Sequence, residues 1–509
     1  MIAVESRNGL FYEAPSMQDF YRSFGLSDYP FNVYTAENES QYSGMLFIHP
    51  LNYDAIKSSF DGNRSIIIRG NRGTGKTALL VDLQQNIPSD ALFCVIDDYT
   101  ELQLPPTTTE YYILLIKSIV AALFLKLFDE KERLKRLDKD DKLFLSFLLS
   151  EYTSPITQRE LTRKIEAIQL SKFRQFVKNK ADIIRAVLNY GLTAGLNVVN
   201  DIIRNYYAGL PLIEESQIRE IVPKFDFDAE TDFNASVASY QLLLRICSLI
   251  EKLGYKKITA FFDKFDEDNR MENNAEIVSE FIKPLMTDNK LLENTSIQII
   301  ISIWEVPFSR ILSTVRTQKH HCPQLSWPIH KLRDALNTRI SVFSNNSICD
   351  YRNLFSSDVS QGSIEEIFYL CNGNPRDLWH IFDRIFQAQY AINANSRFLS
   401  EQAVKNGLDD FVTTFNFYEY YPRKANAKAN SMDVYGYIKH LLKLSTETFT
   451  KNQLNDAAKI GSSISNYVVG MENIGLVVKT NEKYKSGVVY RINDPKVIYA
   501  IKNQLDIAK

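Results

Sequence analysis

The segment Ser65–Thr77, which reads S-I-I-I-R-G-N-R-G-T-G-K-T, constrains the fold of this chain more than any other. Three isoleucines precede a G-x-x-x-x-G-K-T string, and an apolar helix start follows it. In a strand–turn–helix context this spacing binds phosphate, because the glycines let backbone N–H groups turn toward an anion and the lysine reaches the terminal phosphates. A glycine-rich turn that only joins two core elements is the alternative. We predict a parallel α/β domain that binds a nucleotide through Gly70, Asn71, Arg72, Gly73, Thr74, Gly75, Lys76, Thr77 and Ala78.

Length and composition indicate a folded protein with several domains. The 509 residues exceed what one hydrophobic core usually serves. Apolar residues at 45% and charged residues at 24% match the averages of globular proteins. The net charge of −2 argues against a globally basic nucleic-acid binder, although it leaves a local basic patch open.

Cysteine usage and hydropathy predict a cytoplasmic protein without a membrane partner. The five cysteines are scattered without C-x-x-C spacing, which suits a reducing compartment. The cluster His320-His321-Cys322 reads as a solvated loop, because adjacent residues rarely point at one metal. The first residues contain no apolar signal region, and no uncharged apolar run is long enough to span a membrane.

A second apolar strand ends in a group of acids. The segment Lys257–Asp263, K-I-T-A-F-F-D, reads as a buried strand, and K-F-D-E follows it. Nucleotide hydrolysis needs one acid beside Mg²⁺ and another that orients water. We therefore expect Thr77 and Asp263 to hold Mg²⁺, and Asp266 or Glu267 to polarise the attacking water. A solvent-facing acidic turn is the alternative.

The remaining pattern divides the chain into four regions. Residues 1–45 are rich in aromatic and polar side chains and are expected to form an arm that packs on the core domain. Residues 46–325 are expected to form the α/β domain, with a helical insertion at about 131–220 whose charges are mixed in sign. Residues 326–425 read as an all-helical lid. Residues 430–509 predict three helices and then a two-stranded hairpin, which is the order of a winged helix.

Two motifs carry a resemblance to a known family. The string F-F-D-K-F-D-E around Asp263 resembles the D-x-h-D-E form of the Walker B motif in STAND-type signalling ATPases and in prokaryotic relatives of the origin-recognition AAA+ proteins. Gly373-Asn374-Pro375-Arg376 resembles the G-N-P-R sensor 2 motif of the same lineage. The resemblance covers most of Leu46–Ile501 and implies a bacterial-type P-loop NTPase in which Arg376 contacts the γ-phosphate from the lid. The catalytic set that follows is Lys76, Asp266, Glu267 and Arg376.

Three positions bear on how closely the chain follows that family. An AAA+ motor usually places Glu directly after the Walker B Asp, whereas this chain has Lys264, which implies slow hydrolysis. The polar sensor 1 residue at the end of the next strand is Ser302 or Glu305. Arg339 lies near the place where the family carries an Arg that acts on a neighbouring subunit's nucleotide, and a salt bridge within the lid is the alternative.

The expected winged helix lacks the charge of a strong DNA reader. Its expected recognition helix, Ser462–Ile474, contains no Lys or Arg, although Asn466 could touch a base. The wing carries Lys479, Lys483 and Lys485. Because phosphate contacts dominate DNA affinity, we favour a contact within the chain or between subunits over DNA readout.

These patterns lead to the hypothesis of an ATP-binding, slowly hydrolysing switch ATPase of the STAND/AAA+ type. Its nucleotide state would control conformation or assembly, as a homo-oligomer or through a separate effector chain. ATP is favoured over GTP because no N/T-K-x-D string follows the Walker B strand. The resemblance associates such switches with bacterial stress, DNA repair and antiviral defence. Two alternatives stay open: an ATP-dependent DNA-binding protein, and a scaffold whose nucleotide is structural.

Overall fold

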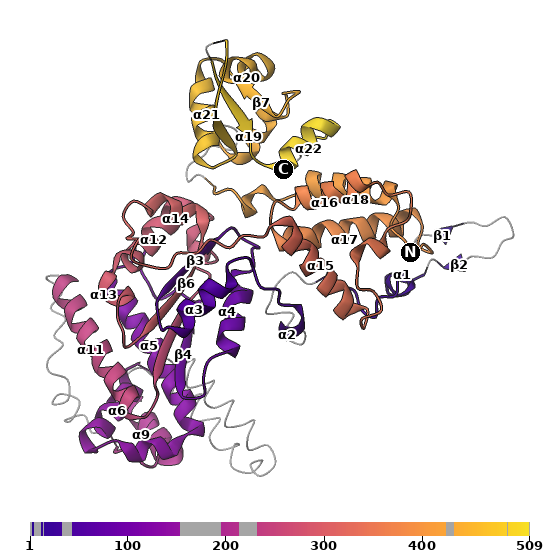
Figure 1. Ribbon diagram of the computed structural model, residues 1–509. Coiled ribbons are helices and arrows are strands. Elements are labelled where there is room, and N and C mark those ends of the chain that lie inside the picture. Colours follow the sequence, from indigo (N-terminus) through magenta and orange to yellow (C-terminus); the bar gives the residue numbers. More distant parts are fainter. Residues whose placement is uncertain are drawn as a thin grey trace.

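The computed structural model describes residues 15–32, 43–152, 195–212, 232–423, 432–485 and 487–507, with two short paired strands, β1 (Ala3–Val4) and β2 (Tyr12–Glu13). Three bodies follow one another along the chain: an α/β domain, a helical domain and a small C-terminal domain (Figure 1). Much of the predicted helical insertion, at 153–194 and 213–220, lies outside the described residues.

A parallel sheet forms the centre of the α/β domain, with its strands in the order β3-β6-β5-β4. The strands are β3 (Ile66–Gly70), β4 (Ala91–Ile96), β5 (Lys257–Phe262) and β6 (Gln298–Trp304). Residues 321–325 extend the sheet beyond β3, where Ile67 N donates to His321 O at 2.9 Å and Leu325 N donates to Arg69 O at 2.8 Å. β6 therefore lies between the glycine-rich loop and the acids after β5, and all three strands end at one edge of the sheet. The predicted parallel α/β architecture is confirmed.

Helices cover both faces of this sheet, because successive strand residues point in opposite directions. Ile66 and Ile68 join one core, which includes residues of α3 (Tyr53–Asp61) and α4 (Lys76–Gln85). Ile67 joins the larger core on the other face, which includes residues of α5 (Thr108–Asp129), α11 (Asp232–Lys252) and α12 (Ala275–Thr287).

Among the described helices, α5 is the one long and apolar enough to cross a membrane, and it packs against β4 and α11 as a core helix.

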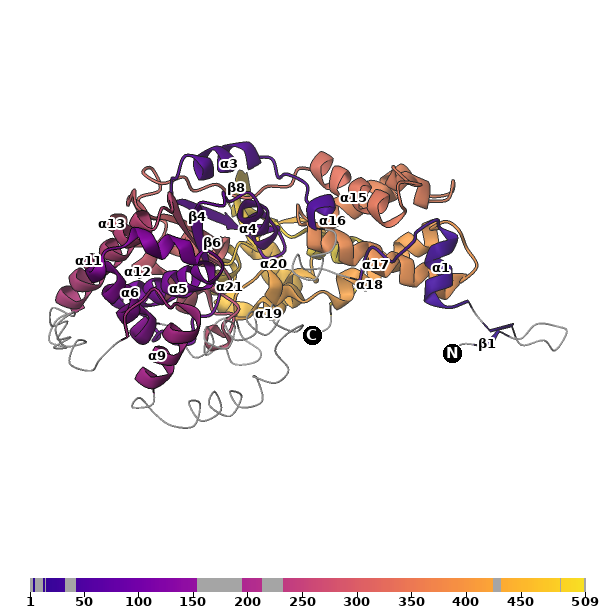
Figure 2. The same ribbon diagram turned by 90° about the horizontal axis from the view of Figure 1, so that it is seen from below.

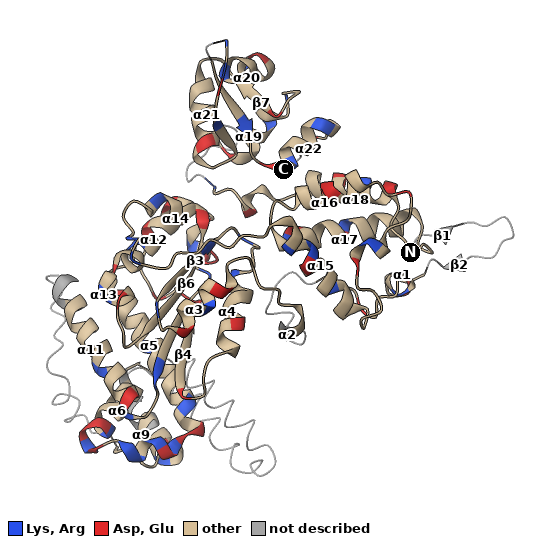
Figure 3. Cartoon of the chain, viewed as in Figure 1, with Lys and Arg blue, Asp and Glu red and all other residues tan. Residues whose placement is uncertain are grey.

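The described part of the insertion includes α6 (Lys139–Tyr152) and α9 (Gly195–Tyr206). Figure 3 shows charges of both signs interleaved on these two helices, as the sequence predicts.

The helical domain follows the sheet and is built from α15 (Ile329–Phe343), α16 (Gln361–Leu370), α17 (Pro375–Ile392) and α18 (Glu401–Thr414). Its core also includes the N-terminal segment with α1 (Met17–Ser23), which lies beside α17 and α18 (Figure 2). Phe20 and Phe31 contact Phe386 at ring-centroid distances of 6.3 and 5.6 Å. We expected this arm on the core domain, but these aromatic contacts place its described part on the helical domain instead.

The C-terminal domain has the element order helix, strand, helix, helix and two strands. These elements are α19 (Val434–Leu441), β7 (Thr448–Thr450), α20 (Lys451–Ala458), α21 (Ile464–Asn473), β8 (Val477–Tyr484) and β9 (Gly487–Ile492). The antiparallel sheet has the order β7-β9-β8. The last helix, α22 (Pro495–Asn503), is shared between two cores: Val497 and Ile498 pack in the C-terminal domain, whereas Tyr499 and Ala500 pack in the helical domain.

Candidate functional site

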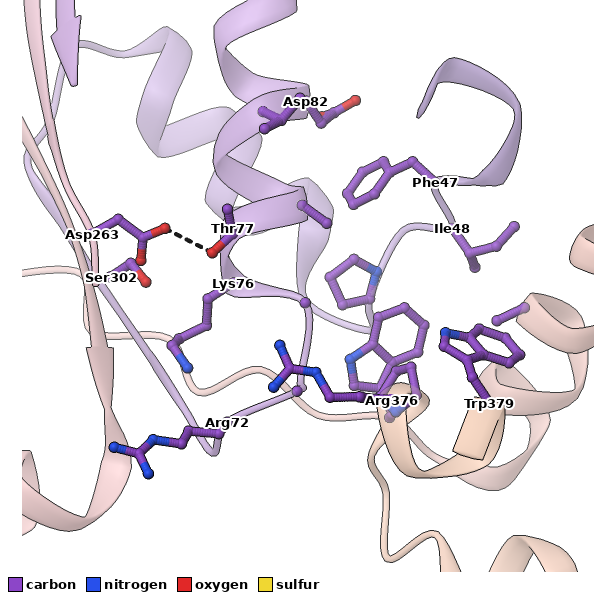
Figure 4. Close-up of a pocket in the computed structure, with 18 of the residues that line it drawn as sticks. Phe47, Ile48, Arg72, Lys76, Thr77, Asp82, Asp263, Ser302, Arg376 and Trp379 are labelled. Carbon is purple, nitrogen blue, oxygen red and sulfur yellow. Dashed lines mark hydrogen bonds between the residues drawn. The ribbon is translucent and has the colours of Figure 1, made fainter. Parts of the chain in front are cut away.

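A cavity of about 790 Å³ opens between the α/β domain and the helical domain (Figure 4). Its walls come from the glycine-rich loop and α4, from the loop after β5, from residues 46–50, and from α15 and α17. The cavity brings together the predicted site residues Arg72, Gly73, Gly75, Lys76, Thr77, Ala78, Asp263, Asp266, Glu267 and Arg376. Gly70, Asn71 and Thr74 complete the loop without being part of the cavity lining. Residues far apart in the sequence thus form one site.

The loop adopts the backbone conformation that its glycines permit. Gly73 and Gly75 have φ values of +80° and +81°, which L side chains rarely adopt. α4 begins immediately afterwards at Lys76, so the free backbone N–H groups of its first turn lie at the cavity. A helix N-terminus of this kind favours an anion through its N–H groups and its dipole.

The Lys76 ammonium lies inside the loop. Its Nζ donates to Gly70 O at 3.1 Å and to Asn71 O at 3.0 Å. Burial lowers the pKa of Lys76, while the Asp266 and Asp263 carboxylates oppose that shift. A phosphate in the cavity would stabilise the charged ammonium further, so the arrangement suits an anionic ligand.

Three oxygen-bearing side chains lie together beyond the lysine. Thr77 Oγ1 donates to Asp263 Oδ2 at 2.7 Å, and Figure 4 shows Ser302 beside them. Ser302 is only 2% exposed and lines the cavity, and its Oγ has no hydrogen-bond partner among the described residues. Hydroxyl and carboxylate oxygens are the ligands that Mg²⁺ prefers, so the side chains fit this ion.

The geometry separates the two sensor 1 candidates. Ser302 points into the cavity from β6, between the glycine-rich loop and β5. Glu305 instead accepts from Arg69 Nη1 at 3.0 Å and does not line the cavity. Ser302 is therefore the polar side chain that occupies the predicted place.

Asp266 is already engaged by an arginine of the loop. Its carboxylate forms a salt bridge with Arg72, whose guanidinium also lies 4.3 Å from the centroid of the Trp304 ring. Glu267 lines the cavity as well. Lys264 adopts a left-handed conformation with φ +60° and places its ammonium 3.9 Å from Asp97. Asp266 thus lines the cavity with its carboxylate paired to Arg72.

The helical domain meets the glycine-rich loop at the start of α17. Asn374 caps this helix, since its Oδ1 accepts from Arg376 N at 3.0 Å. A Cβ on Gly73 would lie 2.5 Å from Asn374 Oδ1, so the two domains touch here without room for a side chain. Arg376 lines the cavity from this helix N-terminus, and its Nε lacks a partner among the described residues.

The end of the cavity away from Asp263 is aromatic and apolar (Figure 4). Trp327 and Trp379 line it together with Phe47 and Ile48, and Trp327 Nε1 donates to Thr74 O at 2.9 Å. The chain has three tryptophans, and the third, Trp304, contacts Arg72 of the same site. Sequence reasoning missed these residues. No motif marks them, because each comes from a different element.

Arg339 also lines the aromatic end of the cavity. It is 3% exposed, its Nε donates to Pro30 O, and its guanidinium lies 4.7 Å from the Trp379 ring centroid. This burial contradicts the interpretation that Arg339 acts on a neighbouring subunit's nucleotide, since the guanidinium is enclosed by its own chain.

Comparison with known proteins gives distant likeness only. No protein-family model matches the chain, and no curated protein matches its sequence. Among solved structures, the Aeropyrum pernix ORC2 protein in its ADPNP–ADP complexes is 10% identical, with 90% of this chain and 96% of that chain covered and a TM-score of 0.40. Its ADP form gives 10% identity, coverages of 95% and 97%, and a TM-score of 0.34.

A third similar structure is Drosophila ORC bound to DNA. It is 9% identical, with 99% of this chain and 96% of that chain covered and a TM-score of 0.31. Values this low do not establish a shared fold by themselves. The sheet order and the residues around the cavity therefore carry the functional assignment.

Proposed function

We propose that this chain binds ATP with Mg²⁺ and hydrolyses it slowly, and that the bound nucleotide sets the position of the helical domain. One observation supports this most directly. Lys76 and Thr77 from the α/β domain and Arg376 from the helical domain line a single cavity. A nucleotide whose phosphates lie at the glycine-rich loop would then contact both domains at once.

The cavity divides into two ends that match the parts of a nucleotide. The glycine-rich loop, the α4 N-terminus and Lys76 suit the phosphates. Trp327, Trp379 and Phe47 offer ring faces and apolar contact for a base. Thr77 and Asp263 would hold Mg²⁺, with Ser302 close by, and the ion would neutralise charge on the phosphates.

Two features near the phosphate end of the cavity support slow hydrolysis. Lys264 occupies the position directly after Asp263, and Asp266 is paired with Arg72. Glu267 lines the cavity and is the second acid proposed to orient water. Hydrolysis by way of Asp266 requires the Arg72 salt bridge to open, which adds a step before the chemistry.

Intrinsic fluorescence tests the proposal without a label, because every tryptophan of the chain lies at this site or one side chain away from it. We expect saturable changes in emission on titration with ATP and Mg²⁺, together with phosphate release at a low rate. An emission unchanged by either ATP or GTP at millimolar concentration, without retention of nucleotide on a filter, would refute nucleotide binding. Binding without any phosphate release would favour the scaffold alternative.

A second candidate function is DNA binding by the C-terminal domain, which we propose to be a winged helix on its element order. The observation in its favour is that Lys479, Lys483 and Lys485 are exposed on the β8–β9 hairpin. α21, by contrast, exposes Asn466 and Val469 and has no Lys or Arg. Salt-dependent DNA binding that Lys483→Ala and Lys485→Ala remove would support this function. Its absence would favour a contact with another chain, either a second copy or an effector.

The biological setting is proposed from the sequence resemblance alone. STAND/AAA+ switches of the bacterial type act in stress responses, DNA repair and antiviral defence, and we propose a cytoplasmic role of this kind. Retention of a partner chain in one nucleotide state and not in the other would identify an effector.

A further inference from the structure

We propose that Lys496 and Tyr420 are positioning residues of the nucleotide site, through which the C-terminal domain holds the helical domain against the glycine-rich loop. The inference rests on the proposed nucleotide binding. A continuous set of buried polar contacts carries it, with members from the loop, α17, the segment after α18 and α22.

The first contact joins the helical domain to the loop. Asn374 is 3% exposed, and its Nδ2 donates to Arg72 O at 2.8 Å. The same amide caps α17 through its Oδ1, so one side chain sets both the loop carbonyl and the helix N-terminus that carries Arg376. A shift of Asn374 would move both groups relative to a bound phosphate.

The second contact fixes how Asn374 is oriented. Its Nδ2 also donates to Tyr420 Oη at 2.6 Å, and Tyr420 donates its hydroxyl proton to Asp377 Oδ2 at 2.6 Å. A phenol has one proton to donate, so Tyr420 can face Asn374 only as an acceptor while Asp377 takes that proton. A charged Asp377 carboxylate accepts that proton more strongly than a neutral group does, so it favours the arrangement in which Tyr420 accepts from Asn374.

The third contact supports the charged form of Asp377 and comes from the C-terminal domain. Asp377 is 4% exposed and lies 3.3 Å from Lys496 Nζ, which is fully buried. Burial raises the pKa of Asp377, and the Lys496 ammonium opposes the rise. Lys496 Nζ also lies 4.3 and 4.4 Å from the Phe415 and Tyr420 ring centroids, within the range of cation–π contacts. While α22 is docked, the Lys496 ammonium therefore stabilises the buried Asp377 carboxylate.

A further contact joins the segment after α18 to Arg72 of the glycine-rich loop. Tyr418 O accepts from Arg72 Nη1 at 3.2 Å and from Asn273 Nδ2 at 2.8 Å. The segment that carries Tyr418 and Tyr420 thus touches the backbone of Arg72 through Asn374 and its guanidinium directly. Because Arg72 also holds Asp266, undocking of α22 would loosen the loop and release the acid together.

The test compares variants that cut the path at two different places. Lys496→Met removes the charge and keeps the length of the side chain, and Tyr420→Phe removes only the hydroxyl. We expect each to weaken ATP affinity about tenfold, a value typical of coupling between sites. The double variant should be no weaker than either single variant, because both cut one path. Lys496→Arg should retain affinity.

The controls separate positioning from folding. Lys502→Met removes an exposed lysine of the same helix and should change neither affinity nor rate. Asp377→Asn with Lys496→Met removes both charges of this pair, and Asp494, which lies 3.8 Å from Lys496 Nζ, still accepts from Tyr421 Oη at 2.9 Å. This pair of substitutions keeps the test open if Lys496→Met fails to fold. That pair should still bind ATP weakly, since a neutral amide does not orient Tyr420 as a carboxylate does.

The outcomes are distinct. Wild-type protein that does not bind ATP would overturn the proposed function itself. Wild-type affinity for ATP in folded Tyr420→Phe and in folded Lys496→Met, or in folded Asp377→Asn with Lys496→Met where the single variant does not fold, would overturn the positioning role alone. Additive losses in the double variant would also overturn it, because they would show independent effects.

Discussion

The two walls of the cavity differ in how their residues are specified. The α/β wall is polar, and its parts are local: Lys76 and Thr77 follow one loop, and Asp263 ends one strand. The helical wall combines Trp379 and Arg376 with contacts that reach the C-terminal domain. In the proposed function, the α/β wall binds phosphate and metal, and the helical wall responds to that binding. Loss of chemistry and loss of response should therefore separate by mutation.

The largest effect is expected on hydrolysis, at the α/β wall. Glu267→Gln or Asp266→Ala should leave ATP binding in place and lower the rate of phosphate release by roughly 100- to 10,000-fold, the usual range for a lost general base. Single-turnover phosphate release beside a binding titration measures this. If both variants hydrolyse at the wild-type rate, the assignment of the water-orienting acids is wrong.

Lys76→Ala should weaken ATP binding by roughly 100-fold, since it removes a charged donor to phosphate. Isothermal titration with a non-hydrolysable ATP analogue gives the affinity. Lys256→Ala is the matched control, because its side chain is 83% exposed and its ion pair with Asp90 lies away from the cavity lining. Equal losses in both variants would point to a general charge effect.

Trp379→Ala tests the base end of the helical wall. The loss of one stacking face should cost about tenfold in affinity for ATP and much less for inorganic triphosphate, which has no base. Tyr369→Ala, an exposed aromatic of the same domain, serves as the control. A similar loss for both ligands would place the base elsewhere.

Arg376→Ala should have the smallest effect on affinity, within about fivefold, and a clear effect on response. ATP should protect the wild-type helical domain from limited proteolysis, and this protection should disappear in the variant. If ATP leaves the wild-type cleavage pattern unchanged, the switch itself is contradicted.

The contrast between the two walls also explains which parts of the site could be predicted from the sequence. The phosphate loop, β5 and its acids follow from local spacing, and the cavity contains them together with Arg376 as predicted. The aromatic end of the cavity could not be predicted, because Trp327, Trp379 and Phe47 meet only through tertiary packing. β7 has three residues, too few for an alternating pattern.

The pairing of charged side chains could be predicted least well from the sequence. Arg72 reads as a variable position of the glycine-rich loop, yet it holds Asp266. Lys496 lies in the first turn of α22 and is fully buried, which no pattern in the sequence indicates. Whether a charged residue is solvated or paired depends on which domains dock, and sequence spacing does not contain that information.

The close approach of Gly73 to Asn374 has a consequence for inheritance and for engineering. Because a methyl group at position 73 would collide with the Asn374 amide, the packing of the helical domain requires a glycine here, independently of any bound phosphate. The two positions are expected to change together or not at all among descendants of this chain. A chimera that takes its helical domain from another protein is therefore expected to need the glycine-rich loop of that protein as well.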